Sequence, residues 1–120
     1  MQYMILIYEP ENAYAGEAGQ AALMQIVGKH RALAQEMRDK GHFRDGSGLA
    51  DTSAATTVVT KGGQQTLHDG PFAETREHLG GYYVIDVPDL DAALGFARRV
   101  PVMDGGKVEV RPLMMGGQPV

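Results

Sequence analysis

Two stretches of the chain are apolar at nearly every position. Residues 3–8 are all aromatic, aliphatic or methionine and stop at Glu9-Pro10, and residues 82–87 follow a pair of glycines. Because polar residues do not alternate with apolar ones in either stretch, each is typical of a β-strand covered on both faces. The pattern predicts two central strands of one sheet.

A helical period of three and four residues runs over residues 21–40. Its apolar stripe comprises Leu23, Ile26, Val27, His30, Leu33, Ala34 and Met37. Gly41 follows where a glycine commonly ends a helix. His30 lies seven residues from Leu23 and from Met37, so the period that buries these two side chains also turns the histidine inward.

A second helix is predicted over residues 89–99. Asp89 is a favourable N-cap, and Pro101 ends the helix. The expected buried side consists of Leu90, Ala93, Leu94, Ala97 and Val100. Apolar and charged residues then alternate over 107–113, which indicates a last strand.

The middle of the chain carries weaker signals. Residues 55–61 are rich in β-branched side chains, and Gly62-Gly63 turns the chain into 64–68, so the two segments are predicted to form a hairpin. Residues 43–51 are polar and glycine-rich, and we interpret them as a crossover with a short strand around Leu49.

The order of elements is therefore β-α-β-(β)-β-α-β in a single domain over residues 1–120. This order predicts a ferredoxin-like α+β fold with an extra hairpin strand, in which two helices cover one face of an antiparallel sheet. The strands at 3–8 and 82–87 are apolar on both faces, so the other face would expose a large apolar patch. A second copy packed sheet against sheet is the expected cover, which predicts a homodimer.

Composition narrows the possible partners. The 120 residues carry 15 acids and 11 bases, a net charge of −4, which disfavours nucleic acid and anionic membranes as partners. The chain has no cysteine, so disulfides, thiolate chemistry and cysteine-based zinc sites are excluded. The apolar start lacks a basic flank and is too short for a signal peptide or a spanning helix, so a cytoplasmic protein is expected.

Residues 68–77 concentrate acidic, basic, aromatic and backbone-special residues in one connection between strands. Gly70 and Pro71 hold Asp69 in a defined backbone setting. One interpretation is a tight turn in which the Asp69 carboxylate binds backbone N–H groups. The other is a functional site, because connections between elements carry chemistry more often than the elements do.

The segment 69–77, with the sequence DGPFAETRE, and the following LGGYY of residues 79–83 resemble the signature of the DGPF group of YCII-related proteins. Residues 1–8, 89–93 and 108–112 fit the same pattern, so the resemblance covers nearly the whole chain. Arg76 stands where a lysine is commoner, and His68 before the motif is a further departure. The resemblance implies a dimeric α/β-barrel and an active-site histidine–aspartate pair, which corresponds here to His30 and Asp69.

The resemblance also implies two classes of function. A dehydrochlorinating, lyase-type activity on a hydroxylated aromatic is associated with one branch of the wider family. Genes of the DGPF group often accompany extracytoplasmic-function sigma factors, which favours a regulatory role. Two hypotheses follow: a cofactor-independent enzyme of lyase or isomerase type acting on a small molecule, and a non-catalytic dimer that binds a ligand or a protein.

In the enzyme hypothesis His30 is the acid/base and Asp69 orients it, because a nearby carboxylate fixes the tautomer of an imidazole that titrates near neutral pH. The alternative for His30 is a buried neutral ring that hydrogen-bonds a loop carbonyl. Phe72, Arg76 and Arg111 are the candidate substrate-binding residues. For Arg111, which is expected on the sheet face opposite the helices, a salt bridge is the alternative.

No cofactor and no metal are predicted. Nucleotide-binding glycine motifs are absent from the sequence, and His68, Asp69 and His78 lack the spacing of a regular metal site. His42, just after the first helix, is interpreted as a solvated loop residue.

Overall fold

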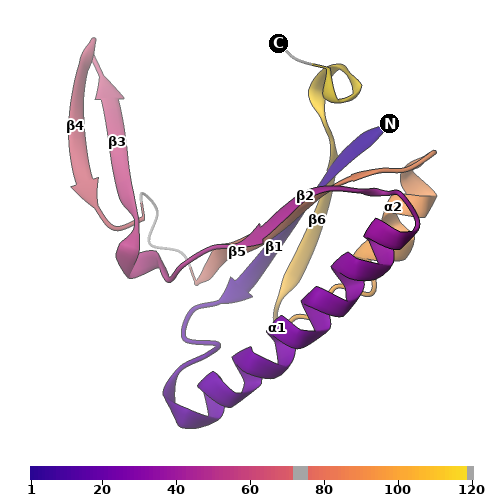
Figure 1. Ribbon diagram of the computed structural model, residues 1–120. Helices are drawn as coiled ribbons and strands as arrows, with labels where there is room; N and C mark the ends of the chain where they lie inside the picture. Colours follow the sequence, from indigo (N-terminus) through magenta and orange to yellow (C-terminus); the bar gives the residue numbers. More distant parts are fainter. Residues whose placement is uncertain (72–75, 119–120) are drawn as a thin grey trace.

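The structure is a computed structural model that describes residues 1–71 and 76–118. Its strands and helices are, in chain order, β1 (Gln2–Pro10), α1 (Gly16–Asp39), β2 (Phe43–Gly48), η1 (Thr52–Ala54), β3 (Thr56–Lys61), β4 (Gln64–Asp69), β5 (Glu77–Asp86), α2 (Leu90–Ala97), β6 (Lys107–Pro112) and η2 (Met114–Gly117). Four strands form an antiparallel sheet in the order β2-β5-β1-β6 (Figure 1), and β3 pairs with β4 in a separate two-stranded sheet. This is a mixed α+β architecture compatible with the predicted ferredoxin-like fold.

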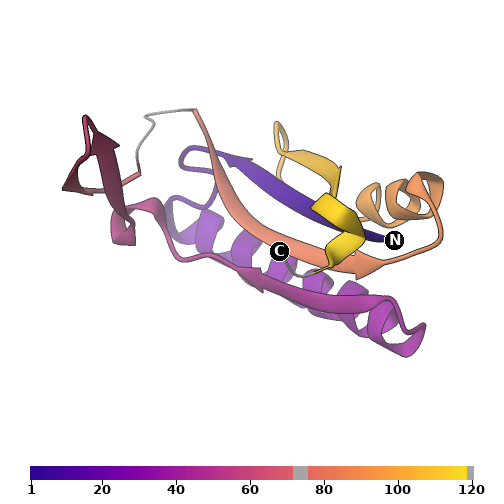
Figure 2. The ribbon, with the colours of Figure 1, turned by 90° about the horizontal axis from the view of Figure 1, so that it is seen from above.

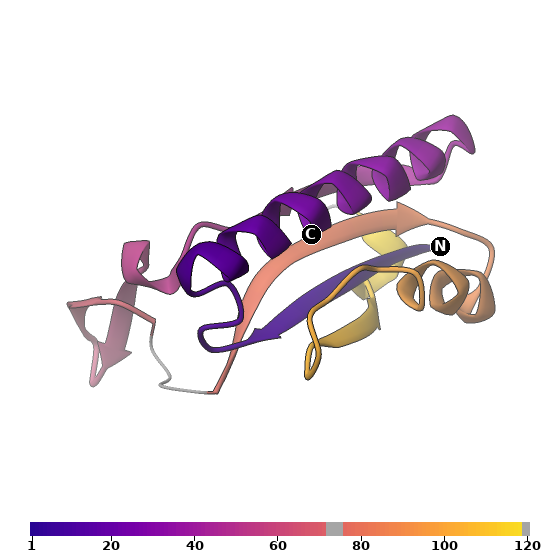
Figure 3. The same ribbon diagram turned by 90° about the horizontal axis from the view of Figure 1, so that it is seen from below.

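The two apolar runs are the central strands, as predicted. Along β1, buried and half-buried side chains alternate. The buried set faces α1 and α2, which lie on the same side of the sheet (Figure 3). The core comprises Tyr3, Ile5, Ile7, Leu33, Ala34, Met37, Tyr83, Ile85, Val87, Ala93, Ala97 and Val100. Burial of these side chains supplies the main favourable term in folding.

The second strand of the main sheet differs from the prediction. It is β2, which spans most of the polar segment 43–51, whereas the β-branched segment near 55–61 pairs only with its own return strand. β2 is an edge strand, so it needs no continuous apolar run. The glycine at position 46 of β2 fits this packing, because a Cβ there would lie 2.8 Å from the ring of Tyr83 on β5.

The β3-β4 hairpin stands beyond the end of the four-stranded sheet (Figures 1 and 2). All six residues of β4 are exposed, including Leu67, which is 75% exposed opposite Val58. The radius of gyration of 16.0 Å exceeds the roughly 13.6 Å expected for a compact domain of this length, in keeping with a projecting hairpin. A two-stranded hairpin alone is at best marginally stable in water, so the pairing of β3 with β4 contributes little stability by itself.

Both helices match their predicted positions within a few residues. α1 begins earlier than predicted, at Gly16, and Gly19 packs against the backbone of Tyr14. The Asp89 side chain caps α2 by accepting a hydrogen bond from the Ala92 N–H at 2.9 Å, as predicted.

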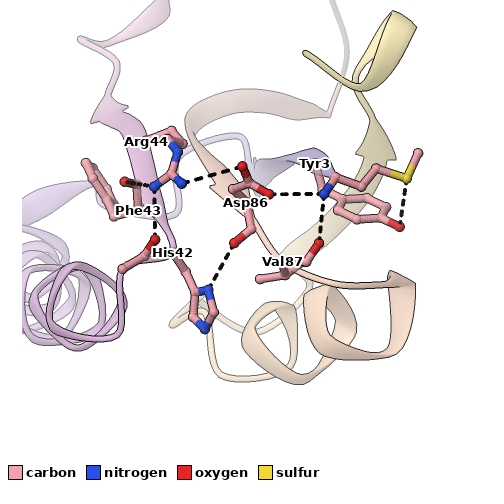
Figure 4. A network of polar contacts seen from close by, with 8 residues as sticks. Tyr3, His42, Phe43, Arg44, Asp86 and Val87 are labelled. Atoms are coloured by element: carbon pink, nitrogen blue, oxygen red, sulfur yellow. Dashed lines mark hydrogen bonds and ion pairs between the residues drawn. The ribbon is translucent and has the colours of Figure 1, made fainter. Parts of the chain in front are cut away.

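A polar network fastens the start of the chain to the end of β5 (Figure 4). The terminal ammonium of Met1 lies 3.0 Å from an Asp86 carboxylate oxygen, and Arg44 lies 3.5 Å from the other one. The His42 ring is 2.9 Å from the Asp86 carbonyl oxygen and packs on Phe96. His42 is a loop residue between α1 and β2, as predicted, but its ring is half-buried against β5 and α2 rather than solvated.

We expect Gly28→Ala to raise the free energy of unfolding by about 0.5–1 kcal/mol, because alanine restricts the unfolded chain and favours a helix. Gly28 lies inside α1, is exposed, and has open space where the Cβ would be. Urea unfolding measures the change. Gly46→Ala is the contrasting variant, and its clash with the Tyr83 ring should lower stability by about 1–3 kcal/mol; equal effects of the two substitutions would contradict this packing.

Candidate functional site

A cleft of about 980 Å³ opens between α1 and the helix-facing side of the sheet. α1 contributes one wall, while the end of β1, the loop after it, parts of β2 and β5, and residues 49–52 contribute the rest. Its apolar lining includes Ile7, Leu23, Ile26 and Val27. A cleft of this size with a few convergent polar groups is typical of a small-molecule site.

His30 lines this cleft from the middle of α1, so the inward orientation predicted for its side chain is confirmed. Its Nδ1 atom lies 2.6 Å from the hydroxyl oxygen of Tyr83, a buried residue of β5. The same hydroxyl lies 3.3 Å from the main-chain carbonyl oxygen of His30. A phenol has a single proton, so it donates either to Nδ1 or to that carbonyl. If it donates to the carbonyl, Nδ1–H donates to the phenol and Nε2 carries the lone pair. If it donates to Nδ1 instead, the ring N–H is on Nε2 and is the donor available to the backbone carbonyl of Pro101, which is the loop-carbonyl contact expected as the alternative for His30.

Burial sets the protonation state of this pair. Desolvation lowers the pKa of His30, and the backbone carbonyl of Pro101 opposes that effect. Desolvation also raises the pKa of Tyr83 to about 12, although the charge of Arg38 acts in the other direction. At neutral pH the imidazole is therefore uncharged and the phenol keeps its proton.

A buried carboxylate closes the other end of the cleft. Glu9 is 8% exposed and accepts hydrogen bonds from the Tyr14 hydroxyl at 2.6 Å and from the Met103 N–H at 3.2 Å. Burial and the neighbouring Glu9 raise the pKa of Tyr14. These bonds hold the loop after β1 and the loop before β6 against the strand, so Glu9 shapes the cleft.

Two arginines of α1 also line the cleft, Arg31 and Arg38. The guanidinium carbon of Arg38 lies 4.2 Å from the centroid of the Phe43 ring. Within residues 1–71 and 76–118, neither arginine forms an ion pair. The cleft thus combines apolar walls, a neutral imidazole and two cations.

The structure does not bring Asp69 to His30 within one copy of the chain. Asp69 ends β4 at the base of the projecting hairpin, opposite Thr56, and is exposed (Figure 1). No hydrogen bond or ion pair joins it to His30 among the residues described. The group that contacts the His30 ring is Tyr83, so a pairing of His30 with Asp69 stays a prediction for an assembly of copies.

The three predicted substrate-binding residues are also dispersed. Phe72 lies outside the described residues. Arg76 is exposed just before β5, where its carbonyl accepts a hydrogen bond from the Glu11 N–H. Arg111 is opposite Met4 in the register, so it lies on the sheet face away from the helices, as predicted, and away from the cleft.

The sequence patterns did not single out Tyr83, Glu9, Arg31 or Arg38 as candidate site residues. Strand alternation does place Glu9 and Tyr83 on the helix-facing side, as it does Ile7 and Ile85. That signal identifies the face but not the partner, because the contact of Tyr83 with His30 spans 53 positions of the sequence.

A smaller hollow of about 420 Å³ lies between α2 and β6, lined mainly by Leu90, Leu94, Ala97, Val108 and Val110. Arg98 is the one ionisable residue in its lining, so the larger cleft is the better candidate for chemistry. Within the described part of the chain, no group of three acidic, histidine or cysteine side chains is placed to hold a metal ion. The described helices include none that is long and apolar enough to span a membrane.

Comparison with known proteins identifies the family. The YCII-related domain matches residues 1–115. An uncharacterised protein of Rhizobium meliloti (strain 1021), R00369, is 34% identical over 120 residues, covering 96% of this chain and 94% of its own length. The chain belongs to the YCII-related family.

Proposed function

We propose that this YCII-related protein is a cofactor-independent enzyme that moves a proton on a small molecule bound in the cleft, with His30 as the acid/base. The observation that carries the proposal is the half-buried His30, uncharged at neutral pH, on the wall of a cleft of about 980 Å³. A general base works best when its pKa lies near or below the working pH, so that it is unprotonated but still basic.

In this proposal the Nδ1–H of His30 donates to Tyr83, and Nε2 faces the substrate. Nε2 removes a proton from a carbon next to a carbonyl group or from an acidic hydroxyl, which leaves an enolate or phenolate and an imidazolium. Returning that proton to a different carbon gives an isomerase. Departure of a leaving group from the enolate gives a lyase, and the proton then leaves with the product or passes to solvent.

Solvent exchange tests this chemistry without knowledge of the natural substrate. A panel of small keto acids and cyclic ketones is incubated with the protein in D₂O, and the loss of each α-proton signal is followed by NMR. The expected result is exchange faster than in buffer for at least one compound. Exchange at the buffer rate throughout the panel would contradict the proposal.

We further propose that the working form is a homodimer, as in the dimeric α/β-barrel arrangement implied by the DGPF resemblance. The sheet face opposite the helices supports this, because it presents Met4, Leu6, Tyr8, Tyr82 and Val84 in one half-buried apolar row. Charges flank the row at both edges, with Arg111 on β6 and Asp45 on β2, whose carboxylate accepts from Tyr82. A two-fold axis parallel to the strands would bring each arginine edge over the aspartate edge of the second copy.

In the proposed dimer, Asp69 of one copy would lie beside His30 of the other copy. It shares the exposed hairpin face with Val58 and Leu67, the face that needs a cover. The cysteine-free chain allows a direct test: copies carrying His30→Cys and copies carrying Asp69→Cys are coexpressed and oxidised. A covalent dimer that needs both variants supports the pairing, and its absence contradicts the proposed role of Asp69.

The second candidate is a non-catalytic dimer with a regulatory role, linked to an extracytoplasmic-function sigma factor by the DGPF resemblance. The observation that favours it is the exposed hairpin, which suits a protein contact as well as a second copy. A His30→Ala variant that keeps the regulatory function in cells would favour this candidate over the enzyme.

A further inference from the structure

The cleft is charged unevenly along its length. Arg31 and Arg38 lie seven residues apart on α1, and both line the cleft. Seven residues are about two helical turns, or roughly 10.5 Å, so the two side chains project from the same side of the helix. The acidic lining residues, Glu9, Glu11 and Asp51, come instead from the end of β1, the loop after it and the loop before η1.

Two of the three carboxylates at the acidic end, those of Glu9 and Asp51, are engaged in contacts within the protein, and Glu11 is exposed. Both carboxylate oxygens of Glu9 accept hydrogen bonds, one from Tyr14 and one from Met103. Asp51 accepts hydrogen bonds from the backbone and the hydroxyl of Ser53. These groups are therefore less available to attract a cationic ligand.

The two arginines are in the opposite situation. Four other cations of the protein form ion pairs with carboxylates: Arg99 and Lys40 with Glu36, Arg44 with Asp86, and Lys107 with Glu77. In the described residues no carboxylate is matched to Arg31 or Arg38. Arg38 stacks on Phe43, and its charge acts on Tyr83, the hydrogen-bonding partner of His30. A positive potential therefore reaches the proposed reaction centre, in a chain whose net charge is −4.

We infer that the cleft binds a small organic anion, a carboxylate or an enolate on an apolar body, with Arg31 and Arg38 attracting its charge. The apolar body lies against Ile26 and Val27 in the same lining. The inference names the substrate class of the proposed function and rests on it, because the same cations stabilise an enolate formed beside His30.

A pair of fluorescent probes separates charge from apolar burial. 8-Anilinonaphthalene-1-sulfonate is anionic, and N-phenyl-1-naphthylamine has the same ring system without the sulfonate. Titration of the full chain with each probe gives the ratio of their dissociation constants. We expect the anionic probe to bind about threefold to tenfold more tightly, which is the range for two partly exposed charge contacts. The preference should shrink as salt is added.

The double variant Arg31→Gln/Arg38→Gln should bring the ratio close to one while binding of the uncharged probe is retained. Lys29→Gln, on the exposed side of α1 outside the cleft lining, is the control for loss of positive charge and should keep the wild-type ratio. Equal affinity for the two probes in the wild-type protein, an unchanged ratio in the double variant, or no binding of either probe would overturn the inference.

The probe titration tests anion binding, and the α-proton exchange experiment tests catalysis, so the two proposals can fail separately. A normal probe preference without α-proton exchange would leave the anion site in place and contradict the catalytic role of His30. α-Proton exchange without a preference for the anionic probe would support the catalytic role of His30 and contradict the anion site.

Discussion

Replacing His30 with glutamine is expected to abolish the proton exchange that the wild-type protein catalyses, with a loss of about 10²- to 10⁴-fold, the usual contribution of a general acid/base. Glutamine keeps a hydrogen-bonding group near the Tyr83 hydroxyl, so the packing of α1 on β5 should survive. The measurement is the rate of α-proton loss in D₂O, with circular dichroism and urea unfolding as checks on the fold.

His42→Gln is the matched control for this variant. His42 is also half-buried and also hydrogen-bonded, but to the Asp86 carbonyl oxygen and against Phe96, outside the cleft lining. The exchange rate of His42→Gln should equal that of the wild type. A His30→Gln protein that keeps the full rate, or a His42→Gln protein that loses it, would contradict the assignment of His30.

The second large effect concerns the free face of the sheet. The wild-type protein should have the mass of two 12.9 kDa chains at micromolar concentration, with an interface of at least about 1,000 Å². Leu6→Lys should convert it to a folded monomer, because Leu6 lies in the middle of the apolar row. The introduced ammonium would lie opposite Glu109 on the neighbouring strand β6. This favourable cross-strand pair should keep the monomer folded.

Light scattering coupled to size exclusion measures both masses. Gln25→Lys adds the same charge to an exposed position of α1 and should leave the dimer intact. A wild-type protein that elutes as a monomer would contradict the homodimer, and a dimeric Leu6→Lys protein would place the interface elsewhere.

Much of the fold was predictable because its strongest signals are long and periodic. The apolar run ending at Tyr8 could only be a central strand, and the stripe from Leu23 to Met37 fixed both the first helix and its buried side. The edge strand β2 was predicted only as a short strand around Leu49, because the glycines and polar residues of Phe43–Gly48 give no strand-like pattern. The residues of the hairpin were predicted correctly, but periodicity could not indicate that it leaves the main sheet.

The site was predictable to the same extent. Helical spacing turned His30 inward, and the structure confirms that orientation. The partner of its ring could not be read from spacing, because Tyr83 reaches it from another element and because strand alternation gives only a face. Asp69 was chosen from a local motif, and a local motif does not say which distant residues lie near its carboxylate in the fold.

An NMR titration of the His30 ring shows whether it is an uncharged base open to the cleft. Comparison with His30→Gln assigns the resonances among the four histidines. Because burial lowers the pKa in the folded protein, the unfolded state binds more protons just below pH 6.5. The free energy of unfolding should therefore fall as the pH falls from 6.5 through the pKa of the folded state.

The predicted result is a reversible titration of His30 with a pKa below 6.5, together with a change in its ring resonances when the anionic naphthalene probe is added. A pKa at or above 6.5 would mean that burial does not keep the ring uncharged, and a ring that responds neither to pH nor to the probe would mean that His30 is a sealed structural residue. Either result would contradict the assignment of His30 as the base.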